Sequence, residues 1–306
     1  MNLSVKNNLK SLLKGKKILL GVSGSIAAFK SCDLVRFLKD CGAEVRVVLT
    51  ESAEKFVTPL TLETLSGQKV LRSLWDDEAQ GTHHIDLARW ADLVLVAPAT
   101  ANMVAKLAHG LANDLLTTEI LAFDGPVAIA PAMNPVMFNH PAVQDNMALL
   151  RKRGVKILGP DWGETACGEE GLGRMLEVDE IIELVAATFI PRKKNPKKVL
   201  ITLGPTRSAL DPVRYLTNRS SGKMGAALAW EAWKRGYEVE VISGPVDVAL
   251  PRSIERIKVK TADEMFDAAQ GRWGRADYFI GTAAVLDWDI AEPSLQKMKK
   301  DAGEPE

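Results

Sequence analysis

Short runs of glycine and hydroxyl-bearing residues follow two apolar, strand-length segments near the start of the chain. Ser23, Gly24 and Ser25 come directly after the first segment, and Ser52 follows the second. Hydroxyl groups and backbone N–H groups at the start of a helix can bind an anion such as phosphate. The first run lacks the Gly-x-Gly-x-x-Gly spacing of a dinucleotide site, so a tight turn that binds nothing remains an alternative. Because both runs would lie at the carboxyl ends of adjacent strands, where open sheets bind ligands, together they favour a phosphate-bearing cofactor.

Two later apolar segments are also followed by small and amide residues. Thr100 and Asn102 follow the third segment, and Ala132 and Asn134 follow the fourth. The NH₂ group of Asn134 could bind a carboxylate. The same residue precedes a proline, which suits the first position of a helix, so Asn134 could instead be a helix N-cap. Spacing alone favours the cap.

One histidine and one cysteine could take part in chemistry. His84 could be a general base or a hydrogen-bond donor to an anion, or a structural residue before an amphipathic helix. Cys167 lies in the glycine-rich segment 166–175, close to Arg174. A cysteine in such a place can be a reactive thiol on a flap that closes over a ligand, or an incidental thiol on a surface loop. The residue types leave both alternatives open.

A parallel sheet would bring these residues to one edge, and the first half of the chain has the required pattern. Apolar segments of strand length alternate with amphipathic segments of helix length, which is typical of an α/β fold whose sheet is covered on both faces. We predict strands over 17–22, 44–49, 93–97, 127–130 and 155–158, and helices over 25–41, 101–108, 113–123, 141–153 and 178–188.

The stretch 191–198 is polar, basic and contains prolines, which predicts an interdomain linker; a surface loop inside one domain is the alternative. A second round of strands follows, predicted over 199–202, 239–243 and 278–281, with a possible fourth over 254–259. We therefore predict one domain over 1–190 and a second over 199–306. The loop 203–221 is long for a compact domain, and loops of this kind usually carry function.

Composition excludes several classes of protein. The 39 basic residues balance the 39 acidic residues, which argues against nucleic acid or a membrane surface as the main partner. The three cysteines, Cys32, Cys41 and Cys167, form no Cys-x-x-Cys pair, so we expect neither a disulfide framework nor a zinc finger. Residues 1–17 are polar and basic without a long apolar run, so we expect no signal peptide or membrane anchor and a cytoplasmic location.

Longer motifs in the first half resemble those of a known family. They lie at 21–28, 84–87, 97–102, 131–134 and 166–175, and include Ser-Gly-Ser, His-Ile-Asp-Leu, Pro-Ala-Thr-Ala-Asn, Pro-Ala-Met-Asn and Ala-Cys-Gly-Glu-Glu-Gly-Leu-Gly-Arg-Met. Residues 17–175 closely resemble the flavin-dependent cysteine decarboxylases, above all the decarboxylase half of the bifunctional proteins of coenzyme A biosynthesis. The resemblance implies a flavodoxin/Rossmann-like, doubly wound parallel sheet with FMN as cofactor.

The same resemblance implies roles for single residues. His84 would assist the oxidative decarboxylation of 4′-phosphopantothenoylcysteine, Asn134 would hold the substrate carboxylate, and Cys167 would donate the last proton. FMN would accept the hydride and return it, so no outside electron carrier is needed. The residues expected to bind FMN are Ser23, Gly24, Ser25, Ser52, Thr100, Asn102 and Ala132. The family places FMN at the subunit contacts of a trimer, which implies a homo-oligomer built from trimers.

Motifs at 204–207, 211–214, 218–225, 243–245, 283–285 and 297–300 resemble the ligase half of the same bifunctional proteins. The resemblance implies a second Rossmann-like α/β domain that activates the carboxylate of 4′-phosphopantothenate with CTP and joins it to cysteine. Asn218 would act on the acyl-cytidylate, Lys297 would support its formation, and Mg²⁺ would neutralise the triphosphate. The residues expected to contact CTP are Gly281, Thr282, Ala283, Asp287 and Lys297.

The second half departs from the family pattern. Leu286 and Trp288 stand where the family usually has alanine and tyrosine. The family also continues past the lysine motif with elements that complete the CTP pocket, so we expect an incomplete second domain and a weak or inactive ligase in this chain.

Three alternatives compete with the decarboxylase: a non-catalytic flavin-binding regulatory subunit, a peptidyl-cysteine decarboxylase and a flavin prenyltransferase. The presence of His84, Asn134 and Cys167 argues against the first. The attached ligase segment argues against the second, and the cysteine flap against the third.

Overall fold

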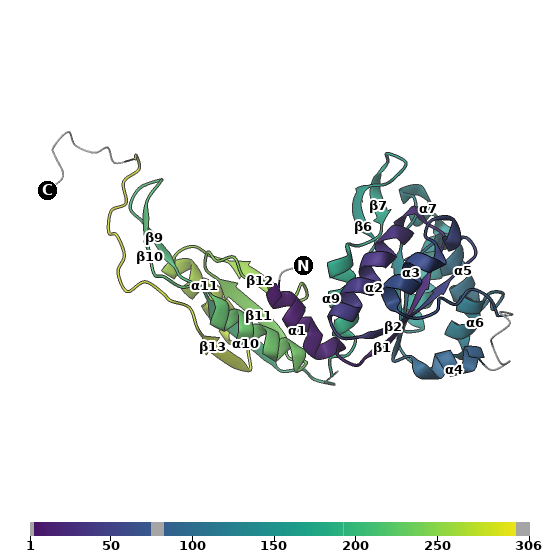
Figure 1. Ribbon diagram of the computed structural model, residues 1–306. Coiled ribbons are helices and arrows are strands. Elements are labelled where there is room, and N and C mark those ends of the chain that lie inside the picture. Colours follow the sequence, from purple (N-terminus) through teal and green to yellow (C-terminus); the bar gives the residue numbers. More distant parts are fainter. Residues whose placement is uncertain (1–2, 75–82, 192, 298–306) are drawn as a thin grey trace. The chain divides into compact units, whose positions relative to one another are not determined.

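The computed structural model describes residues 3–74, 83–191 and 193–297. The chain divides into two compact units, one built mainly from Lys6–Phe189 and the other mainly from Ile190–Glu306. Each unit has its own parallel sheet with helices packed against it, as the labels in Figure 1 show. The two units are therefore described separately.

The first unit contains a five-stranded parallel sheet with the order β2-β1-β3-β4-β5. Its strands are β1 (Lys17–Val22), β2 (Glu44–Leu49), β3 (Leu93–Ala99), β4 (Val127–Pro131) and β5 (Lys156–Ile157). Every residue of β3 is buried, because helices cover both faces, and this explains its continuous apolar sequence. β2 lies on one side of β1 and the later strands lie on the other, so the direction of winding reverses between β1 and β3. The predicted doubly wound α/β fold is confirmed.

Capping side chains set the ends of several helices in this unit. The helices are α1 (Leu3–Leu13), α2 (Lys30–Asp40), α3 (Pro59–Ser66), α4 (His83–Trp90), α5 (Ala101–His109), α6 (Leu115–Ala122), α7 (Pro135–Asn139), α8 (Pro141–Lys152) and α9 (Val178–Ala187), with 3₁₀ turns η1 (Ile26–Phe29) and η2 (Ala53–Lys55). Thr100 caps α5 by accepting the N–H of Met103, and Asp114 caps α6 by accepting the N–H of Thr117. The helix predicted over 25–41 is divided, because the 3₁₀ turn η1 precedes α2.

The first residues of the chain form a helix that we did not predict. Their polar, basic composition hides the spacing of Leu9 and Leu13, which lie one helical turn apart and are both fully buried. Lys6 of this helix forms an ion pair with Asp40 at the end of α2 (2.6 Å). The helix α1 is therefore fixed to the first unit.

The glycine-rich segment 166–175 lies in an antiparallel hairpin. Its strands are β6 (Asp161–Glu164) and β7 (Glu170–Arg174). Gly173 allows β7 to approach the loop after β4, because a Cβ at this position would lie 2.3 Å from the carbonyl oxygen of Met133. The N–H of Met133 donates to the carbonyl of Gly173 (2.9 Å), so the base of the hairpin is bonded to that loop.

The second unit contains a four-stranded parallel sheet with the order β12-β11-β8-β13. Its strands are β8 (Lys198–Leu203), β11 (Glu238–Ser243), β12 (Glu255–Lys258) and β13 (Tyr278–Gly281), and helices α10 (Lys223–Lys234) and α11 (Ala262–Trp273) pack against them. The predicted second Rossmann-like sheet is confirmed. The long loop 203–221 holds a short antiparallel hairpin, β9 (Arg207–Ala209) with β10 (Tyr215–Thr217).

Candidate active site

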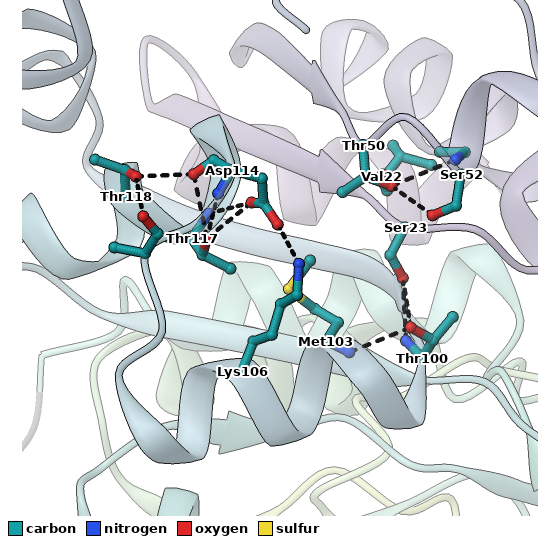
Figure 2. Close-up of polar contacts among 12 residues, drawn as sticks. Val22, Ser23, Thr50, Ser52, Thr100, Met103, Lys106, Asp114, Thr117 and Thr118 are labelled. Atoms are coloured by element: carbon teal, nitrogen blue, oxygen red, sulfur yellow. Dashed lines mark hydrogen bonds and ion pairs between the residues drawn. The ribbon is translucent and has the colours of Figure 1, made fainter. Parts of the chain in front are cut away.

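The loops after β1 and β3 meet at the carboxyl edge of the first sheet. These strands flank the point where the winding reverses, which is where open α/β sheets bind ligands. Ser23 is only 2% exposed, and its Oγ donates to the carbonyl of Pro98 (2.8 Å) and accepts the N–H of Thr100 (3.0 Å). The Ser23–Thr100 contact is drawn in Figure 2 and joins the two loops.

Gly24 lets the loop after β1 lie against the loop after β2. A Cβ at Gly24 would lie 2.5 Å from the Cβ of Ser52, which is closer than two packed carbon atoms can lie. The Oγ of Ser52 is 3.2 Å from Oγ1 of Thr50, and Thr50 Oγ1 donates to the carbonyl of Val22 (3.3 Å; Figure 2). We call the loops that carry Ser23, Gly24, Ser52 and Thr100 the cradle. Hydroxyl and backbone N–H groups in such a narrow space suit a phosphate.

Helix α5, which is capped by Thr100 of the cradle, is joined to helix α6 by an ion pair. Lys106 of α5 forms an ion pair with Asp114, the cap of α6, at 2.7 Å (Figure 2). Burial disfavours the charged form of Asp114, but Lys106 and the N–H and hydroxyl of Thr117 together hold the pKa of this carboxyl below its usual value. The pair therefore stays ionised at neutral pH and holds the start of α6 against α5.

A cavity of about 400 Å³ lies beside the cradle, a size that suits a small ligand. Its walls come from the η1–α2 segment, the loop after β4 and the hairpin β6–β7. The expected FMN residues Ser25 and Ala132 line it. Asn102 lies exposed in the first turn of α5, and no hydrogen bond joins it to the cradle within the described part of the chain.

Asn134 is both a helix cap and a donor aimed at the hairpin. Its Oδ1 accepts the backbone N–H groups of Val136 (2.7 Å) and Met137 (3.3 Å), as the spacing predicted. Because only the oxygen can accept, this arrangement turns the NH₂ group the other way. The Nδ2 atom donates to Sγ of Cys167 (3.3 Å) and to Oε2 of Glu169 (2.7 Å). Asn134 is thus the helix cap that the spacing favours, while its NH₂ group faces the hairpin and its role as a carboxylate ligand stays a prediction.

Cys167 is an exposed thiol at the tip of the hairpin. The hydroxyl of Thr165 (3.1 Å), the amide of Asn134 and the backbone N–H of Glu169 hold the pKa of the thiol below its usual value. Burial and the Glu169 carboxylate act in the opposite direction. The thiol is therefore more acidic than an ordinary cysteine and lies on the wall of the cavity.

The base of the hairpin is held by a charged cluster. Lys30 of α2 donates to Oε1 of Glu177 (3.0 Å) and to the carbonyl of Met175 (3.3 Å), and Arg174 also pairs with Glu177. Burial disfavours the charged form of Glu177, but Lys30 and Arg174 lower the pKa of this carboxyl. Only the tip of the hairpin is free of such anchors among the described contacts.

His84 lies in the first turn of α4, and its side chain is outside the described part of the structure. The expected role of His84 in assisting the oxidative decarboxylation stays a prediction. The other two expected catalytic residues of this unit, Asn134 and Cys167, are in contact.

In the second unit, Asn218 follows the hairpin β9–β10 and reaches the loop after β13. Its Nδ2 donates to the carbonyls of Ala284 (3.3 Å) and Val285 (3.0 Å). Thr282 Oγ1 donates to the carbonyl of Thr202 (2.7 Å), which joins the end of β13 to β8. These contacts place Asn218 beside the loop expected to bind CTP.

The other expected CTP residues are more scattered. Asp287 lines a small cavity of about 90 Å³, together with Ser208 and Thr261. Gly281, Thr282 and Ala283 form the end of β13 and the start of the next loop. Lys297 is exposed, and no hydrogen bond or ion pair joins it to another described residue.

Comparisons with known proteins decide the family. A family model described as "Flavoprotein" matches residues 6–190, and one described as "DNA/pantothenate metabolism flavoprotein C-terminal domain" matches residues 195–306. The coenzyme A biosynthesis bifunctional protein CoaBC of Vibrio vulnificus (strain YJ016) is 52% identical over 289 residues, which cover 94% of this chain and 72% of that protein. The chain belongs to this bifunctional family.

Solved structures agree with the family assignment. A PPC decarboxylase cysteine-to-serine mutant complexed with pantothenoylaminoethenethiol is 34% identical, covers 57% of this chain and 99% of its own, and has a TM-score of 0.52. The FMN-dependent cysteine decarboxylase SpaF is also 34% identical, with the same coverage and a TM-score of 0.50.

Sequence reasoning missed three polar residues of the site. Thr165 and Glu169 contact Cys167 or Asn134, and Lys30 lines the cavity. The hairpin brings Thr165 and Glu169 to the site, and α2 brings Lys30. The pattern of a single sequence does not show which distant segments pack together. Across the described residues there is no group of three or more His, Cys, Asp or Glu side chains that could hold a metal, and no helix with the length and apolar character needed to cross a membrane.

Proposed function

We propose that the first unit decarboxylates 4′-phosphopantothenoylcysteine to 4′-phosphopantetheine with FMN as cofactor. The contact between Asn134 and Cys167 on the wall of the cavity carries this proposal. An oriented amide NH₂ group binds a carboxylate, and a thiol beside it can deliver a proton to the carbon that the carboxylate leaves.

The cradle and the adjoining cavity fit FMN. Ser23, Ser52 and Thr100 would hold the phosphate, and Ser25 and Ala132 would line the space for the rest of the cofactor. A Cβ at Gly24 would collide with Ser52, so the glycine lets the two loops approach and brings their donors together. When bound, FMN supplies the hydride acceptance and return that this decarboxylation requires.

The protein's own residues would orient the substrate and move a proton. Asn134 binds the carboxylate through Nδ2, because its Oδ1 is held by two backbone N–H groups. Thr165 holds the Cys167 thiol in place for proton donation, and His84 assists the decarboxylation. The hairpin covers the cavity and limits the access of water to the reacting carbon.

The second unit would join 4′-phosphopantothenate to cysteine with CTP. The tether of Asn218 to the loop after β13 supports this role, because that loop follows a strand end at the switch point between β8 and β13. Mg²⁺ would enter with CTP, since triphosphate oxygens and water supply most of its ligands in such sites. Lys297 would approach the nucleotide from the exposed C-terminal segment.

We further propose a cytoplasmic homo-oligomer built from trimers. Two large apolar side chains that line the cavity, Ile26 and Phe29, are exposed, and so is Phe56 in the segment that follows Ser52. Exposed apolar residues that gather in this way mark contact surfaces between proteins. The three free cysteines suit a reducing compartment.

The test is to load the purified full chain with FMN and to follow carbon dioxide and 4′-phosphopantetheine after addition of 4′-phosphopantothenoylcysteine. We expect a yellow protein that forms both products in equal amounts. A yellow protein without turnover would support a regulatory flavoprotein instead. A protein that binds no flavin would remove the basis of the decarboxylase proposal.

A further inference from the structure

The NH₂ group of Asn134 has no hydrogen left for a ligand in the free protein. A side-chain amide carries two N–H donors. One is directed at Sγ of Cys167 (3.3 Å) and the other at Oε2 of Glu169 (2.7 Å). The amide cannot rotate to offer another group, because its Oδ1 already accepts two backbone N–H groups. A ligand carboxylate can bind Asn134 only if one of the two partners leaves.

Glu169 is the partner that must leave. It presents a carboxylate, which is the same chemical group that the substrate would bring to this amide. Two carboxylates on one amide would place like charges within a few ångström of each other, which is unfavourable. The thiol of Cys167 is uncharged in its protonated form and does not repel the incoming group.

We propose that Glu169 is a surrogate carboxylate, which occupies the substrate-carboxylate position on Asn134 in the free enzyme, is displaced by the substrate, and returns once that carboxylate has left as carbon dioxide. The inference rests on the proposed function of the first unit. It makes Glu169 a positioning residue, because it acts through Asn134 and the hairpin.

The hairpin tip connects Glu169 to Cys167 as one rigid turn. The N–H of Thr165 donates to the carbonyl of Glu169 (2.9 Å), and so does the Thr165 hydroxyl (3.0 Å). The N–H of Gly168 donates back to the carbonyl of Thr165 (2.9 Å). These bonds hold the backbone of Glu169 in one turn with Cys167, so a displacement of the Glu169 backbone also moves Cys167. Because Met133 and Lys30 hold the base of the hairpin, the displacement is confined to this tip.

Because of this coupling, carboxylate binding by Asn134 and proton donation by Cys167 occur one after the other. While the substrate carboxylate occupies Asn134, the tip and its thiol stand back from the amide. Carbon dioxide is neutral and cannot hold the amide as a carboxylate does, so Glu169 regains its partner when the C–C bond has broken. Its return brings Cys167 back beside Asn134 at the stage when the remaining carbon needs a proton.

The experiment measures ligand binding and turnover in the FMN-loaded full chain. Binding is followed by the change in flavin fluorescence on rapid mixing, before turnover, and turnover is followed by carbon dioxide release. Glu169→Gln removes the charge and keeps the size, and Glu169→Ala removes the side chain. We expect both variants to bind 4′-phosphopantothenoylcysteine about 3- to 10-fold more tightly, because a competing hydrogen bond is weakened or lost.

The product separates competition from a general change of the pocket. 4′-Phosphopantetheine carries no carboxylate, so its affinity should be the same in wild type and in both variants. Glu170→Gln is the matched control: Glu170 is the next residue, also exposed, with no hydrogen bond or ion pair to another described side chain. It should bind substrate and product like the wild type.

Three results would overturn the proposal: unchanged or weaker substrate binding in the Glu169 variants, an equal shift for the product, or the same shift in Glu170→Gln. A wild-type protein that binds the substrate without releasing carbon dioxide would instead contradict the proposed function. The flavin titration still measures the competition in that case, so the two failures are distinguishable.

Discussion

Both units have parallel strands on either side of their first strand, but they differ in how they cover the strand on the later side. In the first unit β3 pairs in parallel with β1, and all seven of its residues are buried. In the second unit β13 pairs in parallel with β8, yet Tyr278 and Phe279 are 45% and 40% exposed. β3 has β4 as its next neighbour, whereas β13 is the last strand of its sheet among the described residues. The same strand position therefore gives a closed core in one unit and an exposed aromatic edge in the other.

The residues that we propose to act in the two units are nevertheless presented in a similar way. Cys167 lies in the short antiparallel hairpin β6–β7, and Asn218 directly follows the short antiparallel hairpin β9–β10. Each side chain then contacts a loop that follows a parallel strand, through Asn134 in one case and through Ala284 and Val285 in the other. The comparison suggests that the hairpin positions the chemistry and the parallel sheet binds the nucleotide cofactor or co-substrate. Substitutions in one unit should then leave the other unit unchanged.

The largest effect is expected for Cys167→Ser. A serine hydroxyl is a far weaker acid than this thiol, so formation of 4′-phosphopantetheine should fall by about 10²- to 10⁴-fold, the usual range for loss of a positioned acid. CTP-dependent ligation, measured in the same preparation, should not change. Cys32→Ser removes a thiol away from the hairpin and should keep both activities. Normal product formation by Cys167→Ser would remove Cys167 from the mechanism.

Asn218→Ala tests whether the second unit can lose activity while the first unit keeps its own. The change removes an amide that donates to two carbonyls of the loop after β13, so ligation should fall by about 10²- to 10³-fold. Carbon dioxide release should be unaffected. Asn195→Ala, at an exposed position in the stretch between the two sheets, serves as control. Comparable losses in both assays would show that the units do not act separately.

The buried acid Glu119 should make the stability of the first unit depend on pH. Its side chain is fully buried in α6, without a hydrogen-bond partner among the described residues, and burial raises its pKa to about 8. The folded unit therefore holds this proton more tightly than the unfolded chain does. The stability that comes from Glu119 is full below pH 4.5 and is lost as the pH rises towards 8. Between pH 4.5 and 7 the free energy of unfolding should fall by about 3 kcal/mol.

Glu119→Gln isolates this contribution, because glutamine has the same shape and does not titrate. Unfolding by urea at several pH values between 4.5 and 8 gives the free energy of unfolding of wild type and variant. The slope of this free energy against pH is then compared between the two proteins. The part of the curve that belongs to the second unit should be identical in both proteins. Parallel pH profiles in wild type and variant would mean that the Glu119 carboxyl is not protonated when folded.

The smallest effect is expected for Gly24→Ala. The added Cβ would collide with Ser52, so the cradle must open and FMN affinity should fall by about 1–3 kcal/mol. Flavin fluorescence titration measures this change, and CTP binding should stay the same. Gly274→Ala is a suitable control, because a Cβ there meets nothing within 4 Å. An unchanged affinity in Gly24→Ala would place FMN away from the cradle.

Much of this arrangement follows from local sequence, and the exceptions have physical causes. Alternating apolar and amphipathic segments predicted both sheets, and hydroxyl residues after strands predicted the cradle. The helical spacing of Leu9 and Leu13 was obscured by the lysines and asparagines around them, so α1 was not predicted. The pairing of β6 with β7 was hidden by glycines that also suit a loose flap. Glu169 lies in a recognised motif, but its contact with Asn134 was not predicted, because the two residues are 35 positions apart in the chain.

The exposed thiol of Cys167, with its lowered pKa, should make the protein sensitive to oxidants. Burial, aided by Asp33 at Cys32, raises the pKa of the Cys32 and Cys41 thiols and keeps them inert. Peroxide should therefore convert Cys167 to sulfenic acid first, and a thiol reductant should reverse this step before further oxidation makes it permanent. Decarboxylation would then fail under oxidative stress while the second unit keeps working, so oxidant exposure would stop the pathway at one defined reaction.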